Sequence, residues 1–330
     1  IGRPNMVLLA DLAGDDSASA DAAAAKIVDF ARSRGGEGFV AITPEARKKF
    51  WLDRSRTAAI AAHTNAFKVN EDVVMPLGRL GEYSDGIERI NIELSIKNKL
   101  ALLDALELFL RGELPLFEDE EGVADPALTE ARRERALVLL AEVRGRWSGY
   151  LADLDAPLPP SLCNVSDHAP QSEGKSVFRA LQDHSLRVSW KREVRAELRQ
   201  IFTGREYEPV LAECDALHQR VLKGRVFVAL HMHAGDGNVH TNIPVNSDDY
   251  AMLQAANQAV ARIMRLAESL DGVISGEHGI GITKLEFLSD KALSEFAAYK
   301  NQVDPDGRFN KGKLLKGADL GNAYTPSFGL

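Results

Sequence analysis

The chain has 330 residues, of which 45% are hydrophobic, a composition that supports one large buried core or two smaller ones. Its 48 acidic residues exceed its 40 basic residues, and the resulting net charge of −8 argues against a nucleic-acid-binding protein. No apolar run approaches the roughly 20 residues of a membrane span. The two cysteines, Cys163 and Cys214, lack metal-type spacing, so we expect reduced thiols and a cytoplasmic protein, with any membrane association through a partner. The opening apolar run, without an initiator Met, indicates a domain cut from a longer chain.

Strands and helices alternate in the first part of the sequence. Short apolar runs at 6–14 and 37–43 predict two strands, and the Ala-rich stretch between them at 16–35 predicts a helix. A second helix is expected over 44–66, followed by a strand over 66–76. These elements form a β-α-β unit with one further helix and strand.

The last part of the sequence repeats this alternation in another order. Residues 224–233 and 238–245 are rich in strand-forming residues and are joined by AGDG, which predicts a hairpin. An amphipathic helix is expected over 248–270 and a short final strand over 272–275. Two such halves without a dinucleotide-binding fingerprint predict an α+β fold, with a ferredoxin-like antiparallel sheet and helices on one face.

Residues 84–222 differ from both halves, because they are charged and show helical rather than strand periodicity. Two breaks, at 112–126 and 156–174, interrupt them. We therefore predict a helical insert at 84–222 that divides an α+β domain into a first half, 1–83, and a second half, 223–330. Apolar residues repeat at helical spacing within the insert, and core packing explains this stripe: Ala136, Leu140, Val143, Trp147, Tyr150 and Leu154.

Two short segments hold most of the reactive side chains. The run HMHAGDGNVH places His231, His233 and His240 around a Gly-rich turn, and SGEHGIG places Glu277 beside His278. Imidazoles with one carboxylate are a ligand set for a catalytic divalent metal. An ordinary hairpin with polar residues at its end would explain a single histidine. Three histidines in ten residues, followed by Glu-His, are harder to explain in that way, but their spacing alone leaves both the hairpin and a metal site open. Glu277 would bind the metal, and His278 would act as a base.

Together with the closing DPDGRFNKGKLL, these motifs resemble the C-terminal domain of the FAD-linked oxidases of the vanillyl-alcohol oxidase superfamily. Within that family the sequence is similar to D-lactate dehydrogenase, the glycolate oxidase flavin subunit and D-2-hydroxyglutarate dehydrogenase. The resemblance is motif-specific over 224–315 and looser over 6–82, and it does not extend to the helical insert.

The resemblance implies a role for several residues of the second half. It implies metal ligands at His233, His240 and Glu277, with zinc or manganese as the metal, and a catalytic base at His278. Asn242 would lie near the substrate. His231 stands where relatives commonly carry an aromatic residue, so we expect it to lie behind the ligands.

Further site residues are implied outside the two histidine-rich segments. The family's stretch for binding a substrate carboxylate resembles DRSRTAAIAAHTNAFKVNEDVVMP, which implies Thr57 and Lys68 together with either Arg54 or Arg56. Asn310 would lie near the flavin, although a lysine follows it where the family has proline. Taken alone, Arg54 and Lys68 would be interpreted as surface charge.

The resemblance implies that this chain is the substrate-binding part of an FAD-dependent dehydrogenase or oxidase for a D-2-hydroxy acid such as lactate, glycolate or 2-hydroxyglutarate. FAD would be held by an upstream domain, so we do not expect it bound to this chain alone. Electrons would leave to an electron-acceptor protein or an iron–sulfur subunit or domain rather than to a nicotinamide.

Two alternatives remain open at this point. A metal-dependent hydrolase could use the same two histidines and glutamate with a water nucleophile, and turnover by this chain alone would favour it. A scaffold domain without catalysis is the second alternative. A large exposed apolar patch on the insert, with no bound metal, would favour that interpretation.

Overall fold

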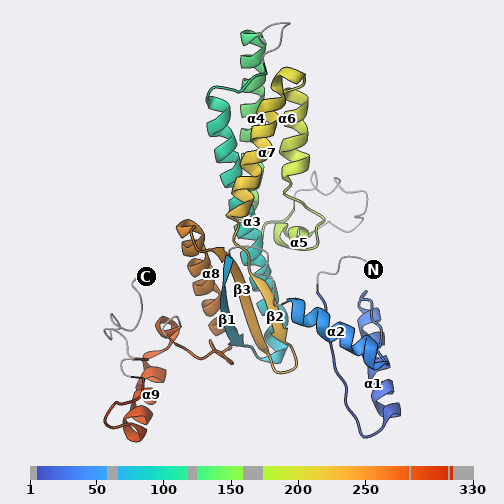
Figure 1. Ribbon diagram of the computed structural model, residues 1–330, viewed down its shortest axis with the longest axis vertical. Helices are drawn as coiled ribbons and strands as arrows, with labels where there is room; N and C mark the ends of the chain where they lie inside the picture. Colours follow the sequence, from blue (N-terminus) through green and yellow to red (C-terminus); the bar gives the residue numbers. More distant parts are fainter. Residues whose placement is uncertain are drawn as a thin grey trace. The chain divides into compact units, whose positions relative to one another are not determined.

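The computed structural model describes most of the chain (Figure 1): residues 6–57, 66–117, 125–158, 174–281, 284–310 and 313–314. The chain separates into two compact units, Ile1–Asn65 and Ala66–Leu330. Helices and a small antiparallel sheet are both present, so the predicted α+β class is confirmed.

The first unit contains two helices, α1 (Ser17–Ser33) and α2 (Pro44–Thr57). A side-chain cap starts each of them. The Asp16 carboxylate accepts from the Ser19 amide at 2.8 Å, and the Thr43 hydroxyl accepts from the Ala46 amide at 3.2 Å. These caps satisfy amides that a helix leaves without internal partners at its first turn. Both helices lie where the sequence predicts them, although α2 ends before residue 66.

The strands predicted at 6–14 and 37–43 are wrong, because both segments are irregular in the structure. A strand needs a neighbouring strand for its backbone hydrogen bonds, and within the described residues neither segment pairs with one. Their apolar side chains are largely exposed, as Val7 and Ile42 illustrate. A short apolar run therefore predicts a buried strand only when the fold places another strand beside it.

The second unit contains a three-stranded antiparallel sheet of β1 (Ala66–Val74), β2 (Ala229–His233) and β3 (Asn238–Asn246). Its strand order is β1-β3-β2, so the hairpin of β2 and β3 lies beside a strand from far earlier in the chain. The prediction of a final strand at 272–275 is only partly confirmed. That segment makes one antiparallel bridge, between Val74 and Val273.

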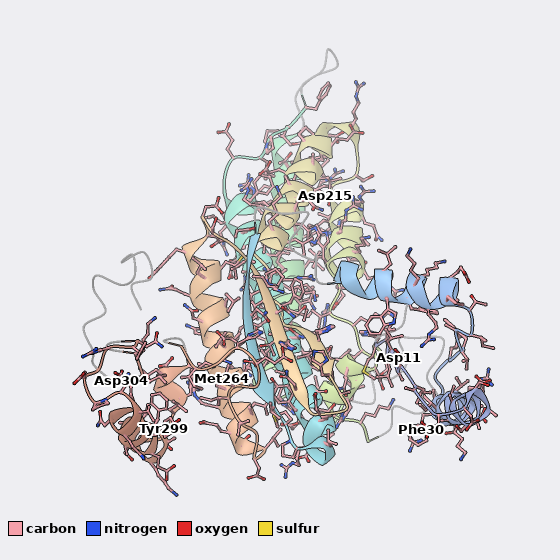
Figure 2. All side chains as sticks on the ribbon, turned by 60° about the horizontal axis from the view of Figure 1, so that its bottom comes forward. Asp11, Phe30, Asp215, Met264, Tyr299 and Asp304 are labelled. Atoms are coloured by element: carbon pink, nitrogen blue, oxygen red, sulfur yellow. The ribbon has the colours of Figure 1, made fainter. Side chains whose placement is uncertain are left out.

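Helix α8 (Tyr250–Ser269) packs on the apolar face of this sheet. Asp249 caps the start of the helix, because its carboxylate accepts from the Met252 amide at 2.9 Å. Met264, labelled in Figure 2, lies on its buried face. The core of the sheet is formed by residues from β1, β3 and α8, together with the start of α3: Val73, Tyr83, Ile87, Ile90, Val239, Ile243, Val245, Ala256, Val260, Ile263 and Met264.

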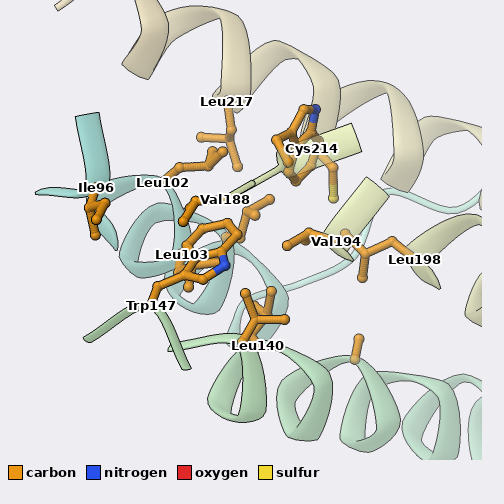
Figure 3. Close-up of a cluster of buried hydrophobic side chains, with 14 of the residues drawn as sticks. Ile96, Leu102, Leu103, Leu140, Trp147, Val188, Val194, Leu198, Cys214 and Leu217 are labelled. Carbon is orange, nitrogen blue, oxygen red and sulfur yellow. The ribbon is translucent and has the colours of Figure 1, made fainter. Parts of the chain in front are cut away.

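Between β1 and β2 the described residues are mainly helical. The longer helices are α3 (Leu80–Arg111), α4 (Pro126–Ala152) and α7 (Glu208–Lys223), and α5 (Val177–Gln182) and α6 (Ala196–Ile201) are short. They enclose a second core, shown in Figure 3, around Trp147, Leu103 and Leu140. Cys214 is buried there as a free thiol, and burial raises its pKa to about 12; Cys163 lies outside the described residues.

Helix α3 belongs to both cores. Its first turns pack with the sheet and α8, and its later turns pack with α4 and α7. At 1.5 Å per residue, its 32 residues span about 48 Å. This single helix therefore fixes the helical region to the sheet that carries the histidines.

The remaining elements are short or lie after α8. One-turn 3-10 helices occur at η2 (Leu77–Arg79), η5 (Arg205–Tyr207) and η6 (Leu285–Phe287), and η4 (Trp190–Arg195) is a π-helix. Helix α9 (Asp290–Val303) is the last in the described part of the chain. Across the described ranges, none of the helices combines the length and apolar character needed to cross a membrane. The described sheet has three strands, and the ferredoxin-like arrangement stays a prediction.

Two leucines on α3 give a direct test of the second core. Leu106 is fully buried, whereas Leu108 on the same helix is 77% exposed. We expect Leu106→Ala to lower the free energy of unfolding by about 2–5 kcal/mol, because it removes buried methyl groups and leaves a cavity. Leu108→Ala should change it by less than about 0.5 kcal/mol. Urea denaturation of both variants checks this, and equal losses would contradict the assignment of the core.

Candidate metal and active site

The sheet has one apolar face and one polar face. Side chains alternate along a strand, and residues paired across an antiparallel ladder lie on the same face. The register pairs Asp72 with His240, His240 with His231, and Asn70 with Asn242. These side chains therefore share the face opposite the apolar one, and the apolar face packs against α8. The alternation of β1 and β3 thus gathers the polar groups of three strands onto one surface.

The hairpin turn brings the second predicted ligand histidine back to the first. Gly237 adopts a φ of +80°, a conformation that favours glycine, and its amide donates to the His233 carbonyl at 3.1 Å. Its own carbonyl accepts from the Met75 amide at 2.9 Å, so the turn is tied to the end of β1. His233 and His240 then face each other with ring centroids 5.7 Å apart.

Three predicted metal ligands converge in the structure. One ligand atom from each of His233, His240 and Glu277 can be chosen so that all lie within 4.8 Å of one another. His233 Nε2 lies 3.8 Å from Glu277 Oε1, and His240 Nε2 lies 3.8 Å from Glu277 Oε2. The Asn238 amide donates to Glu277 Oε1 at 2.6 Å and so fixes the carboxylate above the hairpin.

The environment of His240 favours its neutral form. Burial lowers the pKa of His240, since a charged imidazole loses hydration there. The carboxylate of Glu277 acts in the opposite direction without reversing the shift. A neutral imidazole has a lone pair for a metal, so this shift suits a ligand.

A buried carboxylate holds the loop that carries Glu277 and His278. Asp72 is fully buried, and its Oδ2 accepts from the backbone amides of Gly276 at 2.8 Å and His278 at 3.1 Å, and from that of Glu277 as well. Lys284 Nζ donates to Asp72 Oδ1 at 2.5 Å and to the Asp72 carbonyl at 2.8 Å. Burial alone would raise the pKa of Asp72, but the hydrogen bonds from Lys284 and from the loop amides hold it well below its usual range.

The loop presents the side chains of Glu277 and His278 to different neighbours. Glu277 is directed at the imidazoles of the hairpin. The His278 ring lies 5.1 Å from the His240 ring, and His278 Nδ1 lies 3.8 Å from Asp72 Oδ1. The His231 ring lies 6.0 Å from that of His233 and 6.1 Å from that of His240, and His231 is outside the set of three convergent side chains.

Several amide oxygens on the polar face are buried without a hydrogen-bond partner among the described residues: Asn70 Oδ1, Asn238 Oδ1 and Asn242 Oδ1. Buried polar atoms are nearly always paired in folded proteins, so such a group suggests a surface that meets a ligand. Lys68 lies on β1 with the same alternation, two residues before Asn70, and is half-buried. Asn242 and Lys68 are therefore placed on the face that carries the histidines.

For the other predicted binding residues, the structure shows only their place along the chain. Arg54, Arg56 and Thr57 lie in the last turns of α2, in the first unit, and their side chains are outside the described residues. Asn310 is exposed in a turn after α9, with a φ of +46°. Their roles stay predictions.

Asp72 and Lys284 were missed by the sequence interpretation. An acidic residue within an apolar strand, and a lysine a few residues after the Glu-His pair, were the available signals. Neither identifies its partner, because the two residues are 212 positions apart in the sequence. Only the fold brings them together.

Comparison with known proteins identifies the family. The sequence matches the family model described as FAD linked oxidases, C-terminal domain, over residues 3–100 and 207–314, which together exceed half of the chain. The chain belongs to this family. Its recognition from the sequence motifs is therefore confirmed. The match leaves out residues 101–206, which the described structure shows to be largely helical.

Curated relatives share short stretches with this chain. The glycolate oxidase subunit GlcD of Escherichia coli K12 is 40% identical over 93 residues, which are 27% of this chain and 18% of the relative. A probable mitochondrial D-lactate dehydrogenase of Danio rerio is 34% identical over 88 residues, or 26% of this chain and 18% of the relative. The D-2-hydroxyglutarate dehydrogenase of Xanthomonas citri is 34% identical over 93 residues, which are 26% of this chain and 20% of the relative. The aligned part spans about a fifth of each relative's length.

Gly276 tests how closely the loop approaches the sheet. A Cβ at this position would lie 2.7 Å from Asn238 Oδ1 and 2.9 Å from Val74 Cγ2. We expect Gly276→Ala to lower the free energy of unfolding by roughly 1–3 kcal/mol, because the loop must move away from β1 and β3. Gly235→Ala is the control, since a Cβ there meets nothing within 4 Å. Chemical denaturation compares the two, and an unaffected Gly276 variant would contradict the close approach.

Proposed function

We propose that this chain is the substrate-binding part of an FAD-linked dehydrogenase or oxidase acting on a D-2-hydroxy acid, with a divalent metal held by His233, His240 and Glu277. The observation that carries the proposal is the convergence of these three side chains from two separate segments. Membership of the FAD-linked oxidase family supports oxidoreductase chemistry. The printed names of the relatives support a hydroxy acid such as glycolate, D-lactate or 2-hydroxyglutarate. None of these observations favours a metal-dependent hydrolase or a scaffold domain without catalysis.

The donor set fits a small divalent cation. Ligand atoms about 2.1 Å from a tetrahedral zinc ion lie roughly 3.4 Å from one another. The two histidine–glutamate separations are 3.8 Å, one to each oxygen of Glu277, and the three ligand atoms lie within 4.8 Å of one another, so an adjustment of at most about 1.4 Å would close the site. Three protein ligands leave a further coordination position for substrate, as in catalytic rather than structural zinc sites. Zinc and manganese both suit this mixture of imidazole and carboxylate.

The protein residues around the site have distinct proposed roles. A bound divalent metal would supply Lewis-acid polarisation of the substrate hydroxyl. His278 would accept the hydroxyl proton on its imidazole, since its ring lies beside that of His240 without being one of the three convergent ligands. Lys68 would bind the substrate carboxylate, together with Thr57 and Arg54 or Arg56. Asn242 would orient the substrate through its amide.

The remaining parts of the reaction would lie with other segments or proteins. FAD, which serves as hydride acceptor in enzymes of this kind, would be bound mainly by an upstream domain, and Asn310 would face it. An electron-acceptor protein or iron–sulfur subunit would reoxidise the flavin. We place residues 84–222 as a helical insert between two halves of a ferredoxin-like domain, 1–83 and 223–330. The interruption of the family match over 101–206 supports this division.

Substitutions at 277 and 278 separate metal binding from proton transfer. In the intact enzyme, His278→Ala should keep its metal and lower turnover of a 2-hydroxy acid by roughly 10²–10⁴-fold, because the proton acceptor is lost. Glu277→Ala should lose metal, because it removes one of three protein ligands. Elemental analysis and steady-state kinetics measure the two effects.

The exposed His184 in the helical region provides the control, since His184→Asn should change neither metal content nor turnover. Added metal should partly restore Glu277→Ala but not His278→Ala. If His278→Ala loses its metal and Glu277→Ala keeps it, then His278 binds the metal and Glu277 accepts the proton. Full oxidation of 2-hydroxy acids by both variants would remove the basis for the proposal.

A further inference from the structure

We propose that Asp72, held in place by Lys284, is the positioning residue that sets Glu277 and His278 against the histidines of the hairpin. The proposal rests on the proposed function for its catalytic consequence, but its structural part concerns the loop alone. Neither residue belongs to the predicted metal or substrate ligands. The pair lies directly beneath the segment that carries two of the proposed site residues.

The first observation is that one carboxylate oxygen collects three successive backbone amides. Gly276, Glu277 and His278 all donate to Asp72 Oδ2. Three amides that converge on one point leave the backbone few alternative conformations. Because the side-chain directions of Glu277 and His278 follow from that backbone, Asp72 determines where both point.

The second observation is that Lys284 is 1% exposed, although lysine is almost never fully buried unless it is paired. Its ammonium contacts the Asp72 carboxylate and carbonyl at 2.5 and 2.8 Å, and Glu71 Oε2 at 3.4 Å. Lys284 engages Asp72 Oδ1, which leaves Oδ2 directed at the loop amides. The segment that contains the Glu-His pair is thus fastened at both ends, at 276–278 and at 284, to one residue of β1.

The third observation is the position of Asp72 in the sheet. It pairs with His240 in the β1–β3 ladder, so it lies directly beside one of the ligand histidines. Asp72 therefore links the loop backbone to the strand pair that carries His240, alongside the contact of Asn238 with the Glu277 side chain. Coordination requires ligand atoms placed within a few tenths of an ångström, and the groups that orient such ligands strongly affect metal affinity.

A general stabilising ion pair would make a different prediction from a positioning residue, and Asp72→Asn distinguishes them. Asparagine has the same shape, but its amide group cannot accept from all three amides and also pair with Lys284. In the intact protein, we expect hydrogen–deuterium exchange at 276–278 to accelerate at least about tenfold. We also expect the affinity for cobalt(II), followed by its visible absorption, to fall roughly 10–100-fold. The kcat for a 2-hydroxy acid should fall by more than the KM changes.

Asp215→Asn is the matched control, because Asp215 pairs with Arg195 at 2.6 Å in the helical region. It should leave loop exchange, cobalt affinity and kcat unchanged. If Asp72→Asn does not fold, Lys284→Met and Lys284→Arg take its place. The methionine variant should accelerate exchange at the same three amides, and the arginine variant should restore part of the protection.

Unchanged exchange at 276–278 in folded Asp72→Asn, or equal effects of the two lysine variants, would overturn the proposal. A loss of kcat in Asp72→Asn that is equally large in the control Asp215→Asn would also overturn it. Failure of the proposed function is a separate result: an unsubstituted protein that binds no cobalt and oxidises no 2-hydroxy acid. The amide exchange experiment would still decide whether Asp72 positions the loop.

Discussion

The buried ion pair between Asp72 and Lys284 is the interaction on which the candidate site depends. Taking both charges out of water is unfavourable, and the pair is compensated by three backbone amides and a carbonyl that surround it. The three amides belong to the segment that holds Glu277 and His278, and the carbonyl is that of Asp72 itself. The same contacts that make the buried charges tolerable therefore also build the loop, so stability and function are coupled at this point.

The sheet provides the rigid base for that loop. Its alternation separates an apolar face, packed on α8, from a polar face that carries the histidines. Helix α3 enters both cores, so the helical region and the sheet are fixed through one continuous element. The family match covers the start of α3 and resumes close to α7. The residues between are helical in their described parts and are held by apolar packing of their own.

Local periodicity allowed much of this arrangement to be predicted. The histidine hairpin, β1 and α8 follow from alternation and helical spacing within short windows. The set of His233, His240 and Glu277 was implied by the family resemblance, and these side chains converge in the structure. The failures have a common physical cause, since they depend on partners distant in sequence. The apolar runs at 6–14 and 37–43 do not form strands, and no local pattern joins Asp72 to Lys284.

The most direct test is anomalous diffraction from crystals of the intact protein grown with zinc and recorded on both sides of the zinc absorption edge. The account predicts a single peak in the hairpin site, about 2.0–2.2 Å from a nitrogen of His233, a nitrogen of His240 and an oxygen of Glu277. The amides of 276–278 should still converge on Asp72 in that structure. A peak held by other residues, or a loop that carries Glu277 away from the two imidazoles, would contradict it.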